Sequence, residues 1–115
     1  MDTMYKVDEL LEKLKDLGAW VVAHNDGMAV YRRSDTKDPD FPEGRIFLVV
    51  HEGSDPLIID VGVGRDLSKL LKDRYESVNP SRALDARSWI EVICSGQLSD
   101  DEVIDLIRAS WERAA

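Results

Sequence analysis

The chain has 115 residues, of which 43% are hydrophobic and 33% charged, and its formal net charge is −8. This size and composition exclude a disordered chain and two full hydrophobic cores, so we expect residues 1–115 to form a single domain. The excess of acid opposes nonspecific nucleic-acid binding, because such binding depends on many cations that neutralise phosphates.

The cellular compartment is predicted from the single cysteine and from the first residues. Cys94 has no partner within the chain for a disulfide, as is usual for proteins of reducing compartments. The first residues, Met1–Tyr5, lack the pattern of a secretory signal peptide. No apolar run approaches the roughly 20 residues that cross a bilayer. We therefore expect a cytoplasmic protein with no membrane partner.

The first predicted element is a helix that begins near Thr3 and ends at Gly18. Thr3 is a suitable N-cap, and Gly18 tolerates the left-handed conformation at a helix end. Its apolar residues recur at helical spacing and form one stripe, namely Val7, Leu10, Leu11, Leu14 and Leu17. This helix is expected to cover a hydrophobic surface.

A β-rich half follows, in which two short apolar segments, 20–23 and 28–31, flank a turn. The sequence Asn25-Asp26-Gly27 between them is typical of a tight hairpin turn, because Asn and Gly tolerate positive φ. The polar residues 34–44 predict a loop, since prolines interrupt them. The continuous apolar run 46–50 predicts a central strand.

The next strand is predicted at residues 57–63, where apolar side chains alternate. The apolar face consists of Leu57, Ile59, Val61 and Val63. A second helix is expected to begin with Asp66 as its N-cap. Its predicted core-facing residues are Leu67, Leu70 and Leu71.

After a turn at Pro80, residues 87–94 predict another strand. The last helix has the clearest boundary, because Ser99 and Glu102 form a capping box. Its buried stripe is expected to contain Val103, Ile104, Ile107 and Trp111. The element order is one helix, three or four strands, a helix, one or two strands and a final helix. This order predicts an α+β fold, a two-layer domain in which helices cover an antiparallel sheet.

The stretch from about Gly44 to Trp111 resembles the MmcQ/YjbR family of small bacterial domains. The resemblance rests on the turn Pro80-Ser81-Arg82, the strand residue Trp89, Gly96 and the capping box at Ser99. It implies a compact helix–sheet–helix fold and, from the winged shape of the family, a DNA-binding role.

The chain departs from the family pattern at two positions. Ser88 stands where members often have a histidine, and Asp60 followed by Val61 stands where they tend to have a lysine. Both differences remove basic or titratable character from a surface that we expect to be exposed.

The candidate binding site is the locally basic segment 65–87. Its residues for contact with phosphate are Arg65, Lys69, Lys72, Arg82 and Arg87, and Trp89 offers a face on which a base can stack. The alternative is that the lysines form a solvated helix face, while Arg82 and Arg87 hold a turn through backbone carbonyls.

No catalytic or metal-binding motif is visible in the sequence. The only histidines are His24, expected in a loop, and His51, expected at a strand end, and they lack the spacing of a ligand pair. Cys94 is expected to be a buried hydrophobe, and Gly62-Val63-Gly64 lacks the third glycine of a dinucleotide-binding turn. We therefore predict no catalytic residues, no cofactor and no metal site.

Two functions remain as hypotheses. The first is a noncatalytic binding protein that binds DNA through residues 65–87. The alternative is an acidic protein–protein interaction module or homodimer that binds no nucleic acid, and the net charge of −8 favours it or leaves the two level. A third hypothesis is an enzyme that acts on a small molecule, but the sequence offers no recognisable nucleophile or general base for it.

Overall fold

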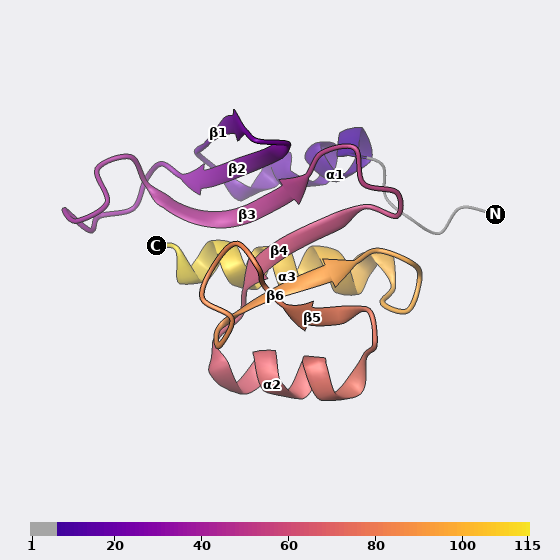
Figure 1. Cartoon of the computed structure of the whole chain (residues 1–115). Helices are drawn as coiled ribbons and strands as arrows, with labels where there is room; N and C mark the ends of the chain where they lie inside the picture. Colours follow the sequence, from indigo (N-terminus) through magenta and orange to yellow (C-terminus); the bar gives the residue numbers. More distant parts are fainter. Residues whose placement is uncertain (1–6) are drawn as a thin grey trace.

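A computed structural model describes residues 7–115, in which three α-helices cover one antiparallel sheet of six strands (Figure 1). The helices are α1 (Val7–Leu14), α2 (Arg65–Arg74) and α3 (Asp100–Arg113), and a 3-10 turn (Lys15–Leu17) follows α1. The strands are β1 (Trp20–Asn25), β2 (Met28–Arg33), β3 (Arg45–His51), β4 (Ile58–Gly62), β5 (Val78–Pro80) and β6 (Trp89–Ile93). The predicted α+β class is confirmed. The proposed cap Thr3 lies outside the described residues.

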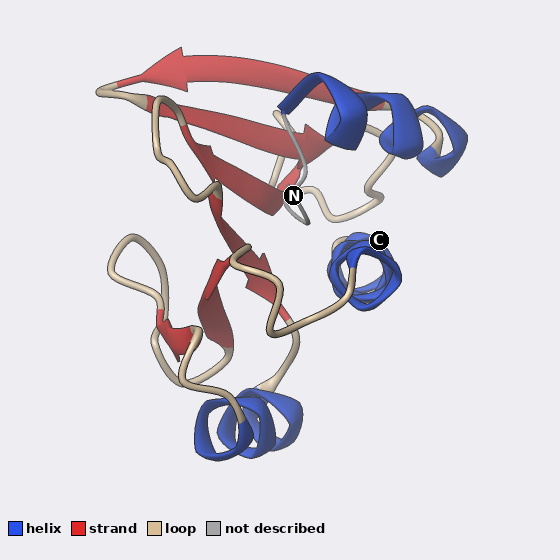
Figure 2. Cartoon of the chain, turned by 90° about the vertical axis from the view of Figure 1, so that its right-hand side faces the viewer, coloured by secondary structure: helices blue, strands red, loops and turns tan. Residues whose placement is uncertain are grey.

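The strands follow the spatial order β1-β2-β3-β4-β6-β5, and every neighbouring pair is antiparallel. The first hairpin turns at Asp26 and Gly27, with φ angles of 51° and 77°, as the turn sequence predicts. Figure 2 shows that the sheet bends, with α1 and α3 on one side of it and α2 at the end near β5. Within residues 7–115, none of the helices combines the length and the apolar character that crossing a membrane requires.

The core lies between the sheet and two helices, α3 at the middle of the sheet and α1, which contributes the buried Leu10 and Leu14. The predicted stripe of α3 is buried, and the ring of Trp111 meets that of Phe47 edge-on at 5.0 Å between centroids. Both halves of the capping box are present: Ser99 Oγ accepts from the Glu102 backbone at 3.1 Å, and Glu102 accepts from the Ser99 backbone at 2.9 Å. These local bonds fix where α3 begins.

Ser110 of α3 joins two strands at the point where they separate. Its hydroxyl donates to the carbonyl of Phe47 on β3 at 2.6 Å and accepts from the backbone N–H of Gly62 on β4 at 2.9 Å. The pairing of β3 with β4 covers only Val49 to His51. Ser110 therefore satisfies two backbone groups that have left the ladder.

Two predictions about α2 are wrong. The helix begins at Arg65 with Gly64 as its cap, and Asp66 lies in the first turn. Leu70 is 56% exposed, while Ser68 is fully buried and Leu67 and Leu71 are half-buried. The reason is that α2 lies at the end of the sheet, against β5 and β6, where it buries only a narrow face.

One histidine was misplaced by the sequence analysis. His24 lies within β1 rather than in a loop, and its side chain is exposed. His51 ends β3, as predicted. Cys94 is buried directly after β6, which agrees with its expected role as a small hydrophobe.

Candidate functional site

A cleft of about 520 Å³ opens where β3 begins and β4 ends, next to the first residue of β6. Its walls come from the loop at residues 40–44, from the sheet, and from the last turn of α3. The side chains that matter for binding are Arg32, Phe41, Arg45, Trp89 and Arg113.

Trp89 is placed in the cleft by a glycine on the neighbouring strand. Gly62 and Trp89 are directly paired between β4 and β6. A Cβ atom at Gly62 would lie 2.7 Å from Cε2 of the indole, closer than real contacts allow. The ring therefore rests on the Gly62 backbone, and it remains half-exposed to the cleft.

The part of the cleft lining that comes from residues 40–45 is held by contacts with the end of β2 and within the loop. Gly44 has a φ of 95°, and a Cβ there would lie 2.3 Å from the carbonyl oxygen of Arg33, so only glycine fits. Arg45 binds Asp38 at 2.8 Å, and its guanidinium lies 4.5 Å from the ring centroid of Phe41. These contacts fix an aromatic ring and a cation in the lining of the cleft.

The charge of the cleft differs from that of the whole chain. Three arginines, Arg32, Arg45 and Arg113, face two acidic residues of the lining, Asp40 and Glu43. Arg45 is already paired, whereas Arg32 and Arg113 make no ion pair within residues 7–115. These two guanidinium groups are therefore available for an anion, although the chain as a whole has a net charge of −8.

The structure divides the basic segment predicted at 65–87. Arg65, Lys69 and Lys72 share one face of α2, because they are separated by four and three residues. Lys72 donates to the carbonyl of Ala86 at 3.2 Å, and Arg87 binds Asp85 at 3.2 Å, so the loop before β6 lies beside this face.

The acidic residue beside this face is Asp85, and hydrogen bonds stabilise its charged form. The backbone and side chain of Arg87 lower the pKa of the Asp85 carboxyl, and the charge of Arg65 adds to the effect. An anionic Asp85 thus stands among the cations of α2 and the loop, and it weakens their combined attraction for phosphate.

Trp89 and Arg82 do not belong to the α2 face. Trp89 lines the cleft. Arg82 crosses from the turn after β5 to the carboxylate of Glu91, with contacts of 3.1 and 3.3 Å. The expectation that Arg82 holds the turn through carbonyls is wrong. The turn is held instead by Ser81, whose hydroxyl accepts from the backbone N–H groups of Ala83 and Leu84.

Sequence reasoning missed a second cluster, made of His51, Asp60 and Glu91. Asp60 was expected on an exposed surface, but it is fully buried because β4 lies in the middle of the sheet. Its Oδ2 atom is 2.8 Å from Nε2 of His51. Burial raises the pKa of the Asp60 carboxyl, the hydrogen bond to His51 opposes this, and the charge of Glu91 adds to it. The available signal was a charged residue in the centre of an apolar strand.

Comparisons with known proteins come from sequence and from structure. No protein-family model matches the chain. The chain is 28% identical over 109 residues to "Uncharacterized protein YjbR" of Escherichia coli strain K12. The aligned residues cover 94% of this chain and 86% of the relative. The YjbR protein of E. coli O157:H7 gives the same values.

Two crystal structures share the fold. One is a Deinococcus radiodurans protein with a domain described as DUF419, at a TM-score of 0.79 and 19% identity, covering 96% of this chain and 78% of that one. The other is a Pseudomonas syringae protein, at a TM-score of 0.74 and 18% identity, covering 96% of this chain and 100% of that one. At these identities the likeness concerns the fold alone.

Proposed function

The chain belongs to a YjbR-like family, and from this premise we propose that it is a noncatalytic protein that binds nucleotide units in the cleft beside Trp89. The ligand class is a mononucleotide or the end of a single-stranded nucleic acid. One observation carries the proposal: an indole and two guanidinium groups that make no ion pair within residues 7–115, those of Arg32 and Arg113, line the same cleft.

Each part of a nucleotide has a matching group in the cleft. A base can stack on the half-exposed ring of Trp89, and such stacking is worth about 1–3 kcal/mol per base. A phosphate suits the guanidinium groups, which donate in a planar fork. The volume of about 520 Å³ lies within the range of small-molecule pockets.

A longer strand would leave the cleft toward α2. The guanidinium of Arg113 lies against Gly64, since its Nη1 atom is 3.0 Å from the position of a Cβ on that glycine. Arg65 follows directly as the first residue of α2 and begins the basic face with Lys69 and Lys72. Arg82 is left out of this path because it is bound to Glu91.

The net charge of −8 limits the affinity. The whole chain repels a polyanion, so we expect weak binding that depends strongly on salt. Duplex DNA, whose bases are already stacked, cannot use Trp89 and is expected to bind less well than a single strand.

The test is fluorescence anisotropy with a labelled single-stranded oligonucleotide, a labelled duplex and unlabelled mononucleotides as competitors, at low and physiological salt. Trp89→Leu and Arg113→Glu are each expected to weaken single-strand binding at least tenfold, while Trp89→Phe retains most of it. The matched control is Arg108→Glu, which makes the same charge change on an exposed residue of α3 outside the cleft.

Two results would contradict the proposal. One is the absence of binding at low salt for the oligonucleotide and for every mononucleotide. The other is an equal loss in the Arg113 and Arg108 variants, because only net charge would then matter. If mononucleotides compete with the oligonucleotide, the cleft binds a single nucleotide. If the oligonucleotide binds and mononucleotides do not compete, the ligand is a longer strand.

A second candidate function is supported by the edge of the sheet. β1 is an edge strand, and Val21 and Val22 on it are 50% and 40% exposed. Exposed apolar edge strands pair readily with another chain. Self-association through β1 predicts a dimer in analytical ultracentrifugation. Val21→Lys is expected to dissociate this dimer. The control Ser95→Lys, at an exposed position after β6, should leave it intact. A monomer at every concentration tested would rule it out.

A further inference from the structure

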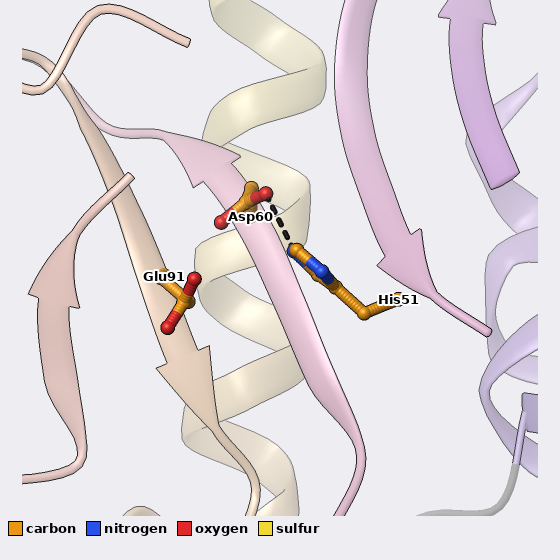
Figure 3. A group of neighbouring side chains, drawn as sticks. All are labelled: His51, Asp60 and Glu91. Atoms are coloured by element: carbon orange, nitrogen blue, oxygen red, sulfur yellow. Dashed lines mark hydrogen bonds and ion pairs between the residues drawn. The ribbon is translucent and has the colours of Figure 1, made fainter. Parts of the chain in front are cut away.

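Three side chains with metal-binding atoms meet on the face of the sheet that points away from α3 (Figure 3). Asp60 on β4 is directly opposite Glu91 on β6 and Val49 on β3. His51 follows Val49 by two residues, which places it on the same face. The alternate residues of these strands, such as Ile59 and Val92, belong to the hydrophobic core instead.

The ligand atoms are close enough to surround one ion. One nitrogen of His51 and one oxygen from each carboxylate all lie within 4.8 Å of one another, and the His51–Asp60 contact is 2.8 Å. Zinc binds nitrogen and oxygen at about 2.0–2.2 Å, which places tetrahedral ligands roughly 3.4 Å apart. Rotation of the Glu91 side chain can supply the remaining approach without a change of the sheet.

One carboxylate oxygen of the group is buried without a partner in residues 7–115. Asp60 is 0% exposed and Glu91 is 5% exposed. Oδ1 of Asp60 has no hydrogen-bond partner anywhere in residues 7–115, although it is buried. A buried carboxylate oxygen without a donor is costly, and the ordinary remedies are a proton, a donor or a metal ion.

We propose that His51, Asp60 and Glu91 form a binding site for a divalent transition-metal ion of the Zn²⁺ or Mn²⁺ class. Two carboxylates match the charge of the ion, and the imidazole favours these metals over Ca²⁺ and Mg²⁺. The His51 side chain is 22% exposed, so the group borders on solvent and leaves a coordination position for water. None of the three residues lines the cleft beside Trp89, and the site is thus separate from the proposed nucleotide site.

Arg82 is the internal competitor of the ion. Its guanidinium contacts both carboxylate oxygens of Glu91, and its side chain is 77% exposed while that of Glu91 is 6% exposed. Arg82 therefore lies on the solvent side of Glu91, where an ion would approach. Metal binding requires this arginine to leave Glu91 and move into solvent, to which its side chain is already largely exposed.

The test is isothermal titration calorimetry of the full chain, without a polyhistidine tag, using Zn²⁺, Mn²⁺ and Mg²⁺ as separate titrants. We expect one Zn²⁺ per chain, and at least tenfold weaker binding of Mg²⁺. His51→Gln is expected to weaken Zn²⁺ binding at least tenfold. The matched control is His24→Gln: His24 also lies beside a carboxylate, with Nδ1 3.1 Å from Glu52, but both side chains are exposed.

A second variant keeps the proposal testable if His51→Gln impairs folding through the loss of its contact with Asp60. Arg82→Gln removes the competitor and is expected to strengthen Zn²⁺ binding about tenfold. Arg87→Gln removes an equally exposed guanidinium that is paired with Asp85, and it should leave the affinity within about twofold.

Three outcomes overturn the site. The first is the absence of stoichiometric Zn²⁺ binding at micromolar concentrations. The second is a loss of binding in His24→Gln equal to that in His51→Gln, which identifies a surface histidine as the ligand. The third is an equal response of the Arg82 and Arg87 variants, because net charge alone would then account for the effect.

Discussion

Replacement of Ser110 by alanine is expected to destabilise the protein through two backbone groups rather than through the serine itself. The hydroxyl satisfies the carbonyl of Phe47 and the N–H of Gly62, both at the separation of β3 and β4. Alanine keeps the fit of the buried position, which is 2% exposed, but it leaves both groups without their partner.

The magnitude follows from the cost of an unsatisfied buried group, about 1–3 kcal/mol each. Two such groups give about 2–6 kcal/mol as the range. Ser110 and Gly62 also line the cleft, so water can reach them and partly replace the hydroxyl. We therefore expect the lower end, about 2 kcal/mol lost from the free energy of unfolding.

Urea denaturation measures this loss. With an m value of about 2 kcal/mol/M, the midpoint is expected to fall by roughly 1 M. Ser95→Ala is the control, since Ser95 is exposed and its replacement should change stability by less than about 0.5 kcal/mol. If Ser110→Ala cost no more than Ser95→Ala, the bridge between β3 and β4 would be irrelevant to stability and the reasoning would be wrong.

Gly62→Ala is expected to displace the indole of Trp89, because the new Cβ would lie 2.7 Å from it, and to weaken oligonucleotide binding severalfold in the anisotropy assay; unchanged binding would show that the ring position is unimportant. Burial raises the pKa of the Cys94 thiol to about 11, so the native protein should not react with a thiol reagent at pH 8, whereas the urea-unfolded chain should react completely; rapid native reaction would contradict the burial. Hydrogen bonds to Ser99 lower the pKa of Glu102, so its stabilising contribution is full above the ordinary glutamate pKa and is lost as the pH falls through the lower, folded value. Glu102→Gln should therefore differ most from the parent in thermal midpoint near pH 6 and converge with it near pH 3; a constant difference would exclude this linkage.

Local signals in the sequence were sufficient for several elements. The capping box of Ser99 and Glu102 and the Asp26-Gly27 turn depend on residues a few positions apart. The apolar residues of α3, which recur at helical spacing, likewise predicted which face of the helix is buried. These features are confirmed, and they were predictable because the residues that interact lie within a single element or hairpin.

The cleft was predicted only in part. Trp89 was named as a stacking face, and it lines the cleft. Its partners Arg32, Arg45 and Arg113 were missed, because they lie on β2, on β3 and at the end of α3. The pairing of β2 with β3 brings Arg32 and Arg45 together, and the packing of α3 on the sheet adds Arg113.

What the sequence by itself determined is the α+β class, the order of the helices and the longer strands and the start of α3, all of which follow from periodicity and short-range capping. The continuous apolar run 46–50 also predicted the interior position of β3, whereas only the tertiary structure decided that β4 lies beside it and which side chains face one another. Asp60 is buried because β4 acquires neighbours on both edges, and it meets Glu91 and His51 through strand register. Leu70 is exposed because α2 packs at the end of the sheet. The physical reason is that the burial of a side chain and the register of a strand depend on contacts between residues far apart in the chain. A local sequence pattern carries no information about those contacts.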